Sequence, residues 1–165
     1  MKVQLQVDGS PVRAAASAAE IAATGADGLF TFEGQHDVFF PLLIAAEATG
    51  CELMTNVAIA PPRSPMHLAY AAYDLQLYSG GRFRLGLGSQ IKVHVEKRYG
   101  SKWEPPAARM AEAISAIKAI FAAWEGRARL DFRGEFYRTP SWRPPSIPAP
   151  TRTGRRRCCW ARWVR

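Results

Sequence analysis

The sequence predicts an α/β fold with a parallel sheet, namely strands one to four of a TIM-type (β/α)8 barrel. Strand-like segments begin near residues 2, 27, 52 and 82, and a helix-like segment follows each of them. A spacing of about 25–30 residues is typical of βαβ units, whose strands pair in parallel. The apolar run at 52–60 suits a strand buried on both faces. A chain of 165 residues is short for a complete barrel, which needs about 250.

Periodicity and breaker residues define each element. Val3, Leu5 and Val7 alternate with polar residues as in a strand, and Pro11 then opens an Ala-rich helix that Gly25 ends. The expected strands are 3–7, 27–33, 52–60 and 82–88, and the expected helices are 11–24, 39–49, 65–78 and 105–124. In the last helix we expect one apolar stripe to pack in the core: Met110, Ile114, Ile117, Phe121 and Trp124.

Two architectures suit such an alternation, a doubly wound sheet and a β/α barrel. A dinucleotide-binding doubly wound sheet places G-x-G-x-x-G after its first strand. The turn here reads Asp8-Gly9-Ser10-Pro11, and Gly86-x-Gly88 after the fourth strand lacks the third glycine. The barrel is therefore the favoured architecture.

Composition excludes several classes of protein. No run of 18 apolar residues occurs and the first ten residues form no apolar signal region, so we expect a cytoplasmic protein without a membrane partner. Three cysteines, two of them adjacent, match neither a disulfide framework nor a zinc site, and we expect no metal.

The net charge of +8 is confined to one end of the chain. Eight arginines and no acidic residue lie from Arg138 onward, so residues 1–137 carry no net charge. We interpret residues 1–138 as the half-barrel and residues 139–165 as a disordered Arg- and Pro-rich tail. A GC-rich back-translation of this tail, shifted by one base, yields a strand-like apolar run, which indicates a frameshift near residue 138. A nucleic-acid-binding tail, with arginines for phosphate and tryptophans for stacking, is the less favoured reading.

Several motifs in order resemble the luciferase-like monooxygenase superfamily. The segment from Gly80 to Gln90 is similar to a signature of that superfamily, and Ser64 to Ala69 is similar to the start of its third helix. Thr31-Phe-Glu-Gly34 with His36-Asp37 resembles a branch of oxidoreductases that use the deazaflavin F420. Arg109-Met110-x-Glu112 and Gly134-Glu-Phe-Tyr137 continue the similarity, which covers residues 1–138.

The resemblance implies that F420, or alternatively FMN, lies across the carboxyl ends of the strands. It also implies a non-proline cis peptide behind the cofactor ring, for which Asn56–Val57 is the candidate. Asn56, Val57 and Ala58 are then expected to contact the cofactor, together with Gly88 and Ser89 after the fourth strand. From its position alone, Asn56 is equally a polar residue at a strand end.

Glu33 and His36 are the catalytic candidates, because they follow the second strand at the same face. In some F420-dependent relatives this region supplies a histidine base, and an acid follows the fourth strand. Here Glu33 stands near the place of that histidine, and Ser89-Gln90-Ile91 contains no acid, so sugar oxidation is not supported. Glu33 equally suits a salt bridge in the barrel mouth. For His36 a position in a solvated loop is favoured over a catalytic role.

The sequence thus predicts an F420- or flavin-dependent oxidoreductase or monooxygenase that acts on a small-molecule substrate. With four strands we expect this chain to be inactive, and a catalytically dead half-barrel is the alternative. Unpaired sheet edges predict association with a second copy.

Overall fold

The computed structural model of the chain describes residues 1–140. Within them the chain divides into two compact units. Met1–Ala58 and Ala71–Gly88 form the first unit, and Ile59–Tyr70 with the segment that begins at Ser89 forms the second. The expected tail lies outside the described residues from residue 141 on, and so do the frameshift and nucleic-acid interpretations that depend on it.

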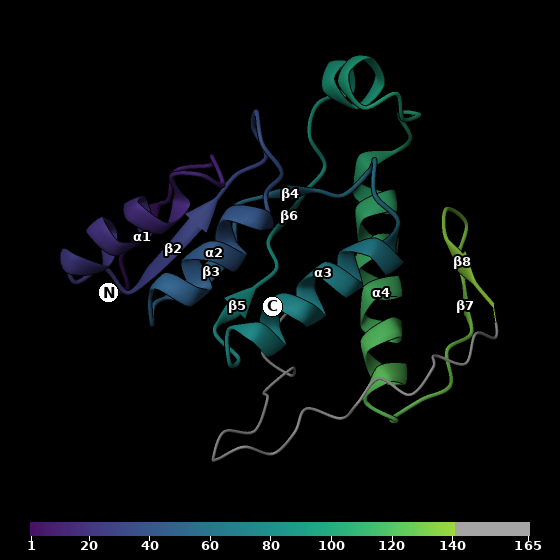
Figure 1. Ribbon diagram of the computed structural model, residues 1–165. Helices are drawn as coiled ribbons and strands as arrows, with labels where there is room; N and C mark the ends of the chain where they lie inside the picture. The colour runs from purple at the N-terminus through teal and green to yellow at the C-terminus, as the bar shows by residue number, and fades with distance from the viewer. Residues whose placement is uncertain (141–165) are drawn as a thin grey trace. The chain divides into compact units, whose positions relative to one another are not determined.

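Four strands of the first unit form one parallel sheet, which confirms the fold class (Figure 1). Their spatial order follows the chain, with each strand beside the next, as in the wall of a β/α barrel. The strands are β1 Gln4–Gln6, β2 Gly28–Thr31, β3 Glu52–Thr55 and β5 Phe83–Arg84.

Three helices connect these strands, close to the expected positions. They are α1 Ala14–Ala23, α2 Phe40–Ala48 and α3 Pro65–Tyr78, and α1 and α2 pack on each other and on β2. Gly25 ends the first helical segment at a φ of 80°, a left-handed conformation that glycine adopts without steric cost. Ser64 caps α3, because its hydroxyl oxygen accepts the backbone N–H of His67 at 3.2 Å.

One apolar row crosses the sheet and forms its buried layer. Leu5, Leu29, Leu53 and Phe83 are in register across the four strands. The last three are completely buried, whereas Leu5 on the edge strand is 39% exposed. Val3, directly before β1, is 45% exposed, whereas Val7, directly after it, is buried.

The third and fourth predicted strands are both interrupted. The expected strand 52–60 divides into β3 and β4 Ala58–Ile59, and the expected strand 82–88 divides into β5 and β6 Leu87–Gly88. β4 pairs with β6 in a separate two-stranded sheet. The break in the fourth predicted strand falls at Leu85-Gly86, where hydrophobic periodicity gave no sign of it. The break in the third falls at Asn56–Val57, the bond for which the family resemblance implied a cis peptide.

The second unit contains two elements that periodicity did not predict. A π-helix, η1 His94–Arg98, lies in the expected loop, and a hairpin of β7 Phe132–Arg133 and β8 Arg138–Thr139 follows the long helix. That helix is α4 Pro106–Trp124.

The buried face of α4 is displaced from the expected stripe. Ile117 is buried as predicted, but the other fully buried positions are Ala113, Ala116 and Ile120. Small alanines allow close packing of a helix, and the larger residues of the stripe lie at the margins of this face.

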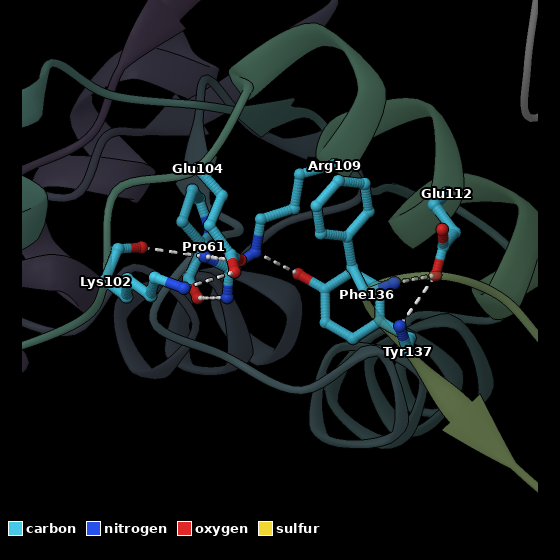
Figure 2. Close-up of polar contacts among 7 residues, drawn as sticks. All are labelled: Pro61, Lys102, Glu104, Arg109, Glu112, Phe136 and Tyr137. Carbon is cyan, nitrogen blue, oxygen red and sulfur yellow. Dashed lines mark hydrogen bonds and ion pairs between the residues drawn. The ribbon is translucent and has the colours of Figure 1, made fainter.

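A carboxylate fixes the hairpin of the second unit to α4. Glu112 accepts backbone N–H groups from Glu135, Phe136 and Tyr137 at 2.9, 2.8 and 2.6 Å. Figure 2 shows the contacts of Glu112 with Phe136 and Tyr137. A Cβ on Gly134 would lie 2.0 Å from a carboxylate oxygen of Glu112, so glycine gives this carboxylate its access to the turn.

The neighbouring Arg109 joins three further segments of the same unit. Its guanidinium donates to the Tyr137 hydroxyl at 3.1 Å and to the Pro61 carbonyl at 3.1 Å, and it pairs with Glu104 at 3.0 Å (Figure 2). The two motif segments around Arg109 and Tyr137 therefore meet in space, and their contacts are structural.

Arg82 joins the ends of two helices and a strand in the first unit. Its guanidinium donates to the carbonyls of Ala46, Thr49 and Cys51 at 3.0, 2.9 and 2.7 Å, and to that of Ser79 at 2.7 Å. These carbonyls lie at the carboxyl ends of α2 and α3 and at the start of β3, where no helical partner remains for several of them. The positive charge also complements the negative ends of both helix dipoles.

Replacing Arg82 with alanine should therefore lower the free energy of unfolding by about 2–4 kcal/mol, since four carbonyls lose a charged donor. Arg84→Ala is the matched control: Arg84 is a half-exposed side chain whose ion pair with Glu52 spans 3.1 Å, and its loss should cost about 0–1 kcal/mol. Urea denaturation of both variants measures the difference. Equal loss of unfolding free energy in the two variants would contradict the role of Arg82 in joining α2, α3 and β3.

Replacing Glu112 with glutamine should release the hairpin, because the new amide turns an N–H group toward backbone donors. We expect the amides of Glu135, Phe136 and Tyr137 to exchange hydrogen faster by about tenfold or more, the equivalent of one lost charged hydrogen bond. Hydrogen exchange read by mass spectrometry on peptides 130–140 measures this change. Exposed Glu96 supplies the control, and unchanged exchange in Glu112→Gln would refute the attachment.

Candidate functional site

A threonine and a glycine hold together the carboxyl ends of β3 and β5. The Thr55 hydroxyl donates to the Gly86 carbonyl at 2.7 Å and accepts the Gly86 N–H at 2.8 Å. The Ala58 N–H donates to the same Gly86 carbonyl at 2.8 Å. A Cβ on Gly86 would lie only 2.1 Å from the Thr55 carbonyl oxygen, so no other residue permits this approach. We refer to these three residues as the Thr55–Gly86 junction.

The backbone between Thr55 and Ala58 is irregular, as the resemblance implied. The Asn56–Val57 peptide bond is cis, which confirms the prediction for this bond. A Cβ on Gly88 would lie 2.4 Å from a methyl carbon of Val57, so β6 lies close against this segment. The structure therefore brings together four of the predicted site residues: Asn56, Val57, Ala58 and Gly88. Ser89 follows Gly88 directly in the chain and is partly exposed.

The side chain of Asn56 is exposed at this end of the sheet, whereas Ala58 is completely buried. The Asn56 N–H donates to the Thr31 carbonyl at 2.7 Å, which continues the pairing of β2 with β3 past their last ladder residues. Ala58 thus supports the backbone, and Asn56 offers a carboxamide.

Glu33 and His36 lie in the loop between β2 and α2, at the same end of the sheet. Glu33 is partly exposed and His36 is exposed. Thr31 anchors the loop, because its hydroxyl donates to the Val38 carbonyl at 2.7 Å. Asp37 accepts the Phe39 N–H at 2.8 Å directly before α2. The two catalytic candidates therefore occupy a loop with both ends fixed.

Asp8, which follows β1, is a carboxylate at this end of the sheet that the sequence did not single out as a site residue. Its carboxylate accepts the Ser10 N–H at 2.8 Å and the Arg13 Nε–H at 2.7 Å. The Ser10 hydrogen bond and the Arg13 guanidinium hold the pKa of Asp8 below its usual range, and the charge of His36 acts in the same direction. Asp8 thus follows β1 and His36 follows β2 at the same end of the sheet.

The site meets several requirements of a planar ring ligand. Irregular backbone at the carboxyl ends of parallel strands is the place where β/α barrels bind their ligands. Glycines at 86 and 88 bring two backbone segments close together, and Asn56 supplies hydrogen-bonding atoms.

Among residues 1–140 no three His, Cys, Asp or Glu side chains gather where they could hold a metal ion. None of the helices described there combines the length and apolarity that a membrane span requires.

These features define part of a β/α-barrel fold, with a candidate ligand site at the carboxyl ends of its strands. The family model for luciferase-like monooxygenases matches residues 2–157, and the chain belongs to this family.

Three comparisons illustrate the relationship. An uncharacterized protein of Mycobacterium tuberculosis is 46% identical over 156 residues, which cover 89% of this chain and 46% of that protein. A second protein of M. tuberculosis, provisionally named a coenzyme F420-dependent oxidoreductase, is 34% identical over 70% of this chain and 33% of its own length. The FMN complex of the oxygenating constituent of Pseudomonas putida 3,6-diketocamphane monooxygenase has a TM-score of 0.70 at 16% identity, covering 90% of this chain and 45% of that chain. This chain therefore spans less than half the length of each of these three proteins.

The Gly86→Ala variant should separate the ends of β3 and β5, because its Cβ meets a backbone oxygen that cannot move aside. We expect a loss of about 3 kcal/mol in the free energy of unfolding. Gly50→Ala is the control, since no atom lies within 4 Å of its added Cβ, and it should be neutral within about 1 kcal/mol. Thermal or urea unfolding gives both values, and a stable Gly86→Ala variant would show that the junction tolerates a side chain.

Proposed function

We propose that this chain carries the ring-binding part of an F420- or flavin-dependent oxidoreductase, with F420 as the first choice of cofactor and FMN as the alternative. The observation that carries the proposal is the Thr55–Gly86 junction, which fixes the irregular Asn56–Val57 backbone at the carboxyl ends of the strands. Family membership and the F420- and FMN-linked names of similar proteins support it.

The proposed roles of the residues follow from their positions. The backbone from Asn56 to Ala58 supports one face of the ring, and the Asn56 carboxamide hydrogen-bonds to polar atoms at the ring edge. Gly88 leaves room for close approach, and Ser89 offers a hydroxyl beside it. When bound, such a ring exchanges a hydride or electrons with a small-molecule substrate.

Glu33 and His36 are the proposed proton-transfer groups, because a hydride exchange at carbon is commonly accompanied by gain or loss of a proton. Both are accessible to solvent and lie in a loop with fixed ends. A carboxylate and an imidazole are suitable general acids or bases near neutral pH. Glu33 is favoured as the acid or base closest to the end of β2, with His36 as the second group.

We further propose that this chain, as it stands, binds its cofactor weakly and lacks activity. The described residues supply four barrel strands, whereas barrels of this type frequently bind phosphate after strands seven and eight. In the described sheet, β1 and β5 each pair with a single strand, so self-association through these edges is proposed too.

Titration of the purified chain with F420, FMN and riboflavin tests both parts of this proposal. We expect measurable binding of the ring and nearly equal affinities for FMN and riboflavin, because the phosphate finds few partners. The fluorescence of each ligand measures binding, and a solution of the oxidised ligand without protein serves as the blank. The Gly86→Ala variant should abolish binding. Absence of any binding would refute the ring site, and an FMN affinity tenfold or more above that of riboflavin would reveal a phosphate site.

A further inference from the structure

An aromatic residue at the end of β2 is exposed beside the site. Phe32 directly follows Thr31, the last residue of β2, and 50% of its surface is exposed. An exposed phenyl ring forgoes much of the free energy that burial of an aromatic side chain provides. Neither the catalytic nor the cofactor assignments made above give Phe32 a role.

The position of Phe32 follows from the register of β2 and β3. Thr31 pairs with Thr55, and both are buried. Because side chains alternate along strands, the next residues, Phe32 and Asn56, belong to the opposite face of the sheet. Asn56 is hydrogen-bonded through its N–H to the carbonyl of Thr31, so the two exposed side chains leave adjacent points of the paired backbones.

Two further large side chains lie on the same face of the sheet, two residues before Phe32 and two residues before Asn56. Phe30 of β2 pairs in register with Met54 of β3, and both are only partly buried. An aromatic ring and a polarizable thioether form an adaptable apolar surface next to Phe32. Together with Asn56, these side chains combine a flat apolar surface with one hydrogen-bonding group, which is the common composition of small-molecule sites.

The ring of Phe32 is held in place by its own loop. A Cβ built on Gly34 would lie 2.9 Å from Cε2 of Phe32, which is closer than real Cβ contacts. The ring therefore packs over the backbone at Gly34, and any larger residue there would displace it. This contact fixes the orientation of an exposed aromatic side chain without burying it.

We propose that Phe32 contacts the planar ring of the ligand directly, packing against it beside the Asn56–Val57 backbone. This inference rests on the proposed function, because it assumes that the site binds a flavin-type ring. It adds a specific apolar contact from the residue after β2 to the contacts assigned to Asn56–Ala58 and Gly88. Phe32 then favours a planar, weakly polar tricyclic ring over a sugar or a phosphate ester.

Tryptophan substitution tests the contact spectroscopically. An indole that stacks on a flavin quenches its fluorescence by electron transfer, whereas phenylalanine does so weakly. Phe32→Trp should therefore bind riboflavin with markedly stronger quenching at saturation than the wild-type chain. Phe40→Trp is the matched control, because Phe40 lies on α2 and is 61% exposed. The control should leave both affinity and saturating fluorescence unchanged.

Two further variants separate contact from folding. Phe32→Ala should weaken riboflavin binding by about threefold to tenfold, the range expected for one aromatic pair. Gly34→Ala should weaken it similarly by displacing the Phe32 ring. Urea unfolding of each variant reports whether the fold is retained, and Phe32→Leu should restore part of the affinity by restoring apolar contact.

The outcomes distinguish this inference from the proposed function. If the wild-type chain binds riboflavin and Phe32→Trp quenches more strongly than Phe40→Trp, the contact is supported. If the wild-type chain binds but both tryptophan variants behave alike and Phe32→Ala retains full affinity, the contact is overturned while the ring site stands. If the folded wild-type chain binds no ring ligand, the proposed function and the contact are both overturned.

Discussion

The paired hydrogen bonds between Thr55 and Gly86 are the constraint on which the site depends. One hydroxyl serves as donor and acceptor to both backbone groups of a single residue, so it substitutes for a segment of the β-ladder. Beyond this point β3 and β5 no longer continue as regular strands, and β4 pairs with β6 instead. The irregular backbone between them is thereby held in place while its outer surface stays accessible.

Hydrogen bonds of this kind also explain why the interruption is stable. Regular sheets satisfy backbone polar groups by their ladder, and a break leaves some of these groups without partners. Here the Gly86 carbonyl accepts both the Thr55 hydroxyl and the Ala58 N–H, and the Asn56 N–H reaches the Thr31 carbonyl. These backbone groups at the break therefore have partners, and the Asn56 side chain stays exposed.

Side chains with structural roles account for much of the motif similarity. Arg82 fixes the ends of α2 and α3 to the start of β3, and Glu112 with Arg109 fixes the hairpin to α4. Motif residues of this type indicate the fold, and the reacting groups must be sought elsewhere. In the proposed site these groups come from loops whose ends are held by Thr31, Asp37 and the Thr55–Gly86 junction.

The sequence by itself determined the order of strands and helices in the first unit, because apolar periodicity and Pro and Gly breakers act over short stretches of chain. It also located Asn56–Val57 and Gly88, through resemblance to a family. Only the tertiary structure decided where β5 ends and how both breaks are held, since these depend on hydrogen bonds between Thr55 and Gly86, residues 31 positions apart. The exposure of Leu5 and Phe32 was likewise undetermined, because burial depends on which elements pack beside a residue, and a strand pattern specifies only the face on which it lies.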